Sequence, residues 1–350
     1  TEVLLPLWAT KTLGWNASQW ATLRSVRFMA VTLGVIVLGA FSDRFGQKQV
    51  ARLCTVAMAV VLALMGLCGD IGPWILIPVY GLGVSTVFVN LNTLVQEISV
   101  KRQGLANVIY RSCGMAMGIV APILATSLAG WWNSYPAAMA FLAAGLLFLL
   151  PLLRPDHDEA VVEPLGNIRS ELGTLWNTYR LAFRERHLMR YIWFSLLWMN
   201  LTSAVGAFAA IRFTRELQFT DQQFGWICSA TGALNLVLVA ISALFMDRVS
   251  LRAIHVVAGS LAGLGCLLMG INNTQIPSVL GFLLYSSALN LLLSPLSMWV
   301  SRAAGEASST SAFSVHKVAA ALILSISMVA VGVLERWFGM RLVLFGCGIL

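Results

Sequence analysis

Long apolar runs separated by short polar breaks constrain this 350-residue chain more than any other feature. A helix needs roughly 20 mostly apolar residues to cross the hydrocarbon core of a bilayer. Such runs lie near residues 18–41, 50–69, 73–96, 105–130, 136–153, 191–211, 221–246, 253–271, 277–299 and 308–334, with shorter apolar pieces at 1–11 and 340–350. We therefore expect an all-α membrane protein with twelve transmembrane helices, the first and last of them incomplete in this sequence.

The composition supports a lipid bilayer as the surrounding medium. Apolar residues make up 58% of the chain and charged residues only 11%. Ordinary soluble domains carry about 25% charged residues. A chain as apolar as this one has too little polar surface to be covered by water. Intrinsic disorder is excluded by the same figures.

The basic residues indicate an orientation rather than a nucleic-acid partner. They form neither a stripe nor a patch interleaved with aromatic residues. Fourteen Lys and Arg residues lie on the side of the polar stretch 154–190 and five on the opposite side, among them Lys11, Arg212 and Arg215. Four more lie inside apolar runs, which accounts for all 23. Because basic residues are enriched in cytoplasmic loops, we expect this stretch and both ends of the intact chain in the cytoplasm, and the protein in a plasma (inner) membrane.

The two halves of the chain are related by an offset of 204 residues. Thr10 aligns with Thr214, segment 42–48 with 246–252, and Pro73 with Pro277. We expect a six-helix domain at 1–153, a cytoplasmic linker at 154–190 and a second six-helix domain at 191–350. Parallel repeats of this kind are typical of transporters with two similar halves.

A short motif between the second and third runs carries a family resemblance. It consists of Gly39, Asp43, Arg44, Gly46 and Lys48. This motif resembles the signature between helices 2 and 3 of the major facilitator superfamily. A partial copy stands where that family has one, between helices 8 and 9, and consists of Asp247, Arg248 and Arg252.

The resemblance covers the whole chain through helix number, linker and repeat. It implies two pseudo-symmetric six-helix bundles around a central site, and secondary active transport of a small solute by alternating access. Asp43 is then expected to face the start of the run at 308, where Ser and Thr residues leave N–H groups open to an acceptor. Either Asp43 forms a releasable latch there, or Asp43 and Arg44 only set the topology.

Three charged residues near the start of the chain are candidates for proton coupling. An ionisable side chain at membrane depth costs about 2.5 to 3.5 kcal/mol on insertion scales and is a functional candidate by default. Glu2 and Arg27 lie at similar depths in neighbouring antiparallel helices, and Arg24 lies one turn from Arg27. Proton exchange on Glu2 would couple transport to a proton gradient. The alternatives are a structural ion pair, and an Arg24 that extends outward to the membrane surface.

A second set of cations occupies matching places in the two halves. Arg111 pairs by the offset with His316 and Lys317. Together they predict a positively charged cavity that attracts an anionic substrate; alternatively, Arg111 and Lys317 bond to cytoplasmic loops when a gate closes. His316 is either a proton carrier or a hydrogen-bonded structural residue.

Four neutral polar residues complete the candidate substrate site: Asn200, Asn235, Tyr285 and Asn290. Each either lines the cavity or bonds one helix to another, which is worth roughly 0.6 kcal/mol per bond.

The sequence contains no pattern for an enzyme or an ATP-driven pump. HExxH, GxSxG and Walker motifs are all missing, and the cysteines have no ligand-like spacing. No cofactor and no metal are expected. The function expected is a proton-coupled transporter of a small solute, with an organic-anion uniporter or exchanger, or a channel or receptor on the same fold, as alternatives.

Overall fold

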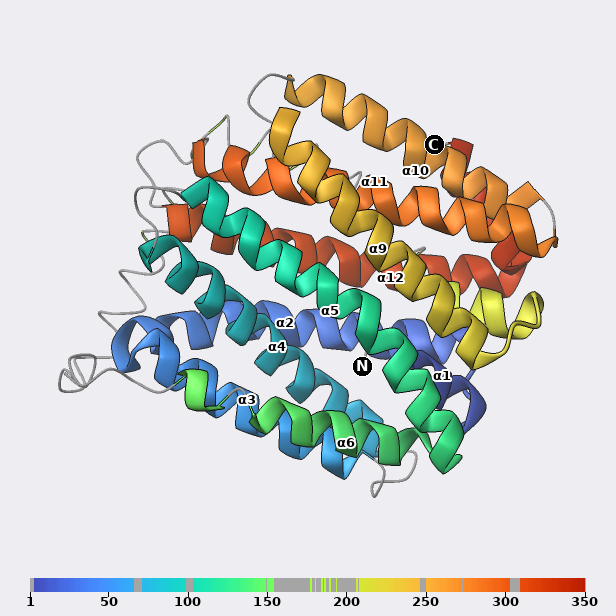
Figure 1. The fold of residues 1–350 in the computed structure, drawn as a ribbon, viewed down its shortest axis with the longest axis horizontal. Helices are drawn as coiled ribbons and strands as arrows, with labels where there is room; N and C mark the ends of the chain where they lie inside the picture. Colours follow the sequence, from blue (N-terminus) through green and yellow to red (C-terminus); the bar gives the residue numbers. More distant parts are fainter. Residues whose placement is uncertain are drawn as a thin grey trace.

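The computed structural model describes residues 3–65, 71–98, 103–148, 150–153, 208–245, 250–271, 273–302 and 309–349, and isolated residues between 177 and 206. All elements in this part of the chain are helices, which confirms the all-α prediction (Figure 1). The predicted linker lies almost entirely outside the described residues.

The helices follow the apolar runs closely. In the first half of the chain they are α1 (Leu4–Lys11), α2 (Ala17–Phe45), α3 (Gln47–Leu64), α4 (Gly72–Ile98), α5 (Gln103–Trp132) and α6 (Tyr135–Leu147), followed by the 3₁₀ turn η1 (Leu150–Leu153). In the second half they are the π-helix η3 (Arg212–Glu216), α9 (Asp221–Phe245), α10 (Leu251–Ile271), α11 (Gln275–Arg302) and α12 (Ser309–Ile349). The run predicted at 136–153 is one continuous helix only as far as Leu147.

Within the described residues, six helical segments are long and apolar enough to cross a membrane. They are Gln47–Leu64, Gly72–Leu91, Ser112–Trp132, Asp221–Ile241, Ala253–Ile271 and Val318–Ile349. Large apolar side chains such as Leu53, Val60 and Ile326 are exposed on them, as expected where lipid replaces water. The chain is an integral membrane protein.

Helix α12 contains a sharp bend at Gly339. This residue has φ 74° and ψ 155°, a conformation that glycine adopts without a Cβ clash. Residues 309–338 and 340–349 are therefore two helices, as predicted, although the first continues four residues past the expected end at 334.

Two seams join the first and second halves of the chain, α2 against α12 and α5 against α9 (Figure 1). Small residues allow the close approach. A Cβ on Gly232 would lie 2.9 Å from the backbone of Gly118, and one on Gly332 would lie 2.6 Å from the Cβ of Ala21. Close approach of helices at small residues is typical of packing within membranes.

The 204-residue offset also relates hydrogen bonds around two equivalent connections, the one before α2 and the one before α9. The hydroxyl groups of Thr10 and Thr214 donate to the carbonyls of Pro6 and Ala210 at 2.7 Å. The backbone N–H groups of Trp15 and Phe219 donate to Ala9 and Phe213 at 3.0 Å. These equal partners confirm the alignment for this segment.

The same offset relates two helix N-termini. Asn16 and Gln19 form a reciprocal capping box before α2, and Thr220 and Gln223 form one before α9. Each cap satisfies backbone N–H groups that the first helical turn leaves without partners.

The glycine of the family motif has the geometry that its position requires. Gly46 separates α2 from α3 with φ 85° and ψ 135°. Asp247 and Arg248 lie outside the described residues. Gly39, Asp43, Arg44 and Arg252 lie on helices whose backbone alone is described there, so the Asp43 latch stays a prediction.

Candidate functional site

Arg27 is the best-defined candidate among the predicted charged residues. It lies ten residues into α2, about 15 Å along the helix axis. Its side chain is buried, and its guanidinium carbon lies 5.5 Å from the centre of the Tyr80 ring on α4. A cation over an aromatic face is attracted by the ring quadrupole, more strongly when water is excluded.

Gly81 leaves the space that the Arg27 side chain occupies. A Cβ on Gly81 would lie 2.7 Å from Cγ of Arg27 and 3.2 Å from its carbonyl oxygen. The glycine next to Tyr80 thus lets α4 approach α2 while a long charged side chain passes between them.

Arg27 faces away from the seam that joins α2 to α12. Ser25 forms a 2.5 Å hydrogen bond with Ser325 on α12. Two residues further along, at 100° per residue, Arg27 is turned about 200° from Ser25 and faces α4. The buried cation therefore belongs to the interior of the first-half helices.

Arg24 lies half-buried on α2. Its guanidinium carbon is 5.6 Å from the ring centres of both Trp20 and Phe28, one turn to either side. The side chain thus rests along its own helix among aromatic rings.

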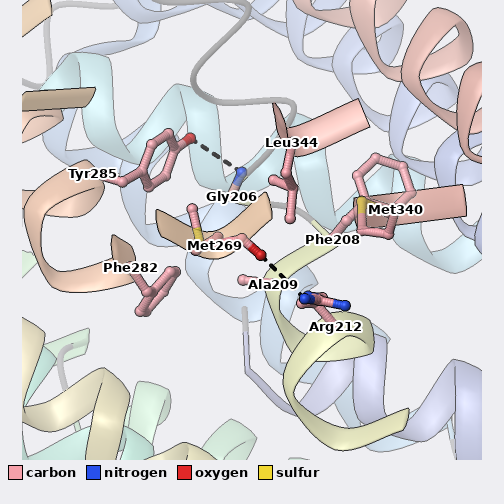
Figure 2. A pocket seen from close by; sticks show the side chains of 9 residues that line it. All are labelled: Gly206, Phe208, Ala209, Arg212, Met269, Phe282, Tyr285, Met340 and Leu344. Carbon is pink, nitrogen blue, oxygen red and sulfur yellow. Dashed lines mark hydrogen bonds between the residues drawn. The ribbon is translucent and has the colours of Figure 1, made fainter. Parts of the chain in front are cut away.

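Tyr285 lines a very small cavity in the second half of the chain (Figure 2). Its hydroxyl accepts the backbone N–H of Gly206 at 3.1 Å, and the side chain is fully buried. The cavity volume of about 10 Å³ is close to what one water requires. In this conformation the cavity has no room for a solute.

Arg212 lines the same cavity, which sequence reasoning missed by assigning Arg212 to an exposed connection. Its side chain is 1% exposed, pairs with Glu216, and donates to the Met269 carbonyl at 3.1 Å (Figure 2). Arg341 donates to the carbonyls of Gly270 and Ile271. The two arginines cap the C-terminal end of α10, where the helix dipole favours cations.

Two predicted asparagines make contacts within the second half. Asn235 on α9 donates to the Ser286 hydroxyl on α11 at 3.4 Å, and Asn290 donates to the Ser286 carbonyl in its own helix. The Asn235 bond joins two helices, as the alternative of helix-to-helix bonding expects, whereas the Asn290 bond stays within α11. The Asn235 side-chain oxygen is buried and has no hydrogen-bond partner among the described residues.

The remaining candidates are only partly described. His316 is buried on α12. Arg111 and Lys317 lie on α5 and α12, described there by their backbone alone. Glu2 and Asn200 lie outside the described residues.

A charged network joins the two halves at the end of the helices where the turns 12–16, 133–134 and 217–220 lie, here called the turn end. Asp221 accepts Lys11 Nζ at 2.5 Å and also the Tyr135 hydroxyl. Arg215 donates to the carbonyls of Thr10 at 2.6 Å and Trp15 at 3.1 Å. Burial, and next the Asp221 carboxylate, raise the pKa of Tyr135, so this hydroxyl stays protonated and donates.

The chain is similar in sequence to known transporters. The chain is 24% identical to the gentisate transporter of Corynebacterium glutamicum over 282 residues, which are 73% of this chain and 59% of that relative. The chain thus spans less than two thirds of that transporter's length.

Solved structures share the fold. A crystal structure of a mutant of nucleoside transporter NupG matches with a TM-score of 0.75 and 16% identity, over 99% of this chain and 92% of that one. The human organic anion transporter MFSD10 matches with a TM-score of 0.64 and 18% identity, over 97% and 85%. A family model matches residues 2–328. With almost its whole length matched in this way, the chain belongs to the Major Facilitator Superfamily.

Proposed function

We propose that this protein is a secondary active transporter that moves a small organic anion across the membrane by alternating access, driven by a proton gradient. The observation that carries the proposal is the buried Arg27, held against the Tyr80 ring at membrane depth. An ionisable residue at membrane depth is a functional-site candidate by default, and a guanidinium is suited to bind an anionic group.

The architecture proposed is twelve helices in two pseudo-symmetric bundles, residues 1–153 and 191–350, joined by a cytoplasmic linker at 154–190. The hydrogen bonds that recur 204 residues apart support this duplication. Parallel repeats place a substrate site near the middle of the membrane, and Arg27 lies at about that depth on the first-half side, facing α4.

The distribution of basic residues supports a plasma-membrane orientation with the linker in the cytoplasm. The turn end then faces outward. The contacts described there join the two halves, so this conformation corresponds to a transporter closed toward the outside.

The relatives' names support an anion as substrate. One relative is named a gentisate transporter, and one structural neighbour an organic anion transporter. Within this chain Arg27 is proposed as the first anion ligand, with Arg24, Arg111, His316 and Lys317 as further contributors. Glu2, Asn200, Asn235, Tyr285 and Asn290 stay candidates for coupling and contact. Membership of a transporter family also favours transport over enzymatic chemistry.

The test uses the whole protein reconstituted in liposomes with an imposed proton gradient. Uptake of radiolabelled gentisate is compared with uptake of a nucleoside and of a quaternary ammonium ion, with and without an uncoupler. We expect anion uptake that the uncoupler abolishes. Anion uptake that survives the uncoupler would identify a uniporter or exchanger, and an unsaturable flux would identify a channel.

Two variants that each remove one positive charge distinguish a role of Arg27 in anion binding from an effect of the protein's net charge. Arg27→Gln should reduce anion uptake at least tenfold, because one charge-assisted contact is worth roughly 1.5 to 3 kcal/mol. Arg52→Gln removes the same charge from an exposed position on α3 and should leave uptake unchanged. Equal loss in both variants would rule out Arg27 as an anion ligand.

A further inference from the structure

Asp221 joins three helix ends with a single carboxylate. It is the first residue of α9, and its two oxygens accept Lys11, the last residue of α1, and Tyr135, the first residue of α6. Both donors come from the first half of the chain, whereas Asp221 comes from the second. One side chain thus ties the two halves together at the turn end.

Capping of α9 does not require this carboxylate. The N-terminus of α9 is already capped by Thr220 and Gln223. At the equivalent place in the first half, inside the capping box of Asn16 and Gln19, the chain has Ala17 instead of an acid. An acidic first residue is therefore dispensable for the cap, and in this chain it serves contacts across the seam.

One basic residue from each half bonds to the other half of the chain. Lys11 and Arg215 are equivalent at the 204-residue offset. Lys11 binds the carboxylate, while Arg215 donates to the carbonyl of Thr10 in the last turn of α1 and to that of Trp15 in the turn after it. Negative partial charge at a helix C-terminus makes the Thr10 carbonyl a good acceptor for a guanidinium.

An apolar cluster lies with these polar contacts at the turn end. Leu7 of α1 packs with Phe213, Leu217 and Phe224 of the second half, and Tyr135 packs against the same cluster. The Phe213 ring centre lies 5.7 Å from that of Phe224. The apolar contact holds residues of the two halves together at the turn end, beside the ion pair of Lys11 and Asp221.

The polar contacts remain open to solvent. The side chains of Lys11 and Asp221 are 39% and 22% exposed. Together with Tyr135, Thr126 and Trp131 they line a cleft of about 660 Å³ between the halves. Exposed ion pairs are individually weak, so such a contact can release without unfolding the helices.

We propose that Asp221 is a latch that holds the outer gate closed, with Lys11 and Tyr135 as its two donors and Arg215 as a supporting clamp on α1. This inference rests on the alternating access proposed above. When the halves separate at the turn end, both bonds to Asp221 break together and the seam between α5 and α9 opens.

A buried position in that seam reports the opening. Thr126 on α5 is 3% exposed and packs beside Gly225 of α9. A Thr126→Cys variant is labelled with a membrane-impermeant maleimide from the turn-end side of proteoliposomes. Matched proteins that keep Thr126 give the background labelling of the native cysteines, of which Cys113 is exposed.

Asp221→Asn should raise the labelling rate about fivefold, and Tyr135→Phe should raise it by a smaller factor. Adding Lys11→Gln to Asp221→Asn should cause no further increase, because the partner is already lost. Gln223→Ala weakens the cap of α9 and leaves the carboxylate in place, so its labelling rate should stay at the parent value.

An unchanged rate in both Asp221→Asn and Tyr135→Phe would overturn the latch, as would an equal increase in Gln223→Ala. The labelling needs no substrate. If Asp221→Asn is labelled faster but the parent protein takes up no anion, the latch is retained and the proposed function is rejected. If the parent protein takes up the anion but Asp221→Asn is labelled at the parent rate, the proposed function is retained and the latch is rejected.

Discussion

Gly14 and Gln218 occupy equivalent places 204 residues apart, and both have a left-handed backbone, with φ of 67° and 58°. Each follows the last helical turn of its segment and precedes a capping box. Glycine adopts this conformation at no steric cost, whereas glutamine does so against its Cβ. The repeat has kept the backbone geometry and changed the residue.

Replacing Gln218 tests this strain. Gln218→Ala and Gln218→Gly both remove the side-chain amide that donates to the Arg215 carbonyl, so they differ only in the cost of positive φ. We expect the glycine variant to be more stable than the alanine variant by about 1 kcal/mol, measured by thermal unfolding in detergent. Equal melting temperatures would contradict the backbone strain.

Gly81 is predicted to be intolerant of a methyl group for a specific reason. Gly81→Ala places a Cβ against Arg27 and forces that side chain off the Tyr80 ring. We expect anion uptake to fall severalfold and the melting temperature to drop, since overpacking costs roughly 1 to 3 kcal/mol. Gly114→Ala is the control, because a Cβ there meets nothing within 4 Å. Similar losses for both would mean that glycine matters for the helix backbone rather than for Arg27.

The seam between α5 and α9 depends on Gly232. A Cβ on this residue would lie 2.9 Å from the carbonyl carbon and oxygen of Gly118, and backbone atoms cannot rotate away. Gly232→Ala should therefore favour separation of the two helices and speed labelling at Thr126→Cys, with unfolding easier by about 1 to 3 kcal/mol. If labelling and stability both match the parent protein, the contact is not close in the membrane.

Alkaline pH should weaken the turn end through Tyr135. Burial and the Asp221 carboxylate raise its folded-state pKa above the unfolded value of about 10. A raised pKa contributes stability that is present below pH 10 and is lost as pH rises above it. Between pH 9 and 11 the melting temperature of the parent protein should therefore fall more steeply than that of Tyr135→Phe. Parallel curves for the two proteins would remove this contribution.

The sequence predicted the helices well because their signals are local. Apolar runs and turn residues placed most boundaries within a few residues, and Pro73 and Pro277 lie at the starts of α4 and α11 as aligned. Gly46 of the motif has positive φ, a conformation for which glycine is the residue best suited. The 204-residue offset also followed from sequence alone, since repeated side chains and caps report a repeated backbone.

What only the tertiary structure decided is which distant residues meet. Arg212 reads as an exposed cation by its place in a connection, yet the crossing of α10 and η3 buries it against Met269. The packing of α4 places Tyr80 over Arg27, a contact that the sequence did not indicate, whereas the predicted pair of Arg27 with Glu2 stays a prediction. Asp221 carried no signal at all, because its role comes from α1 and α6 ending beside it. Local patterns specify each helix, whereas contacts between helices depend on crossing angles and register that no single segment encodes.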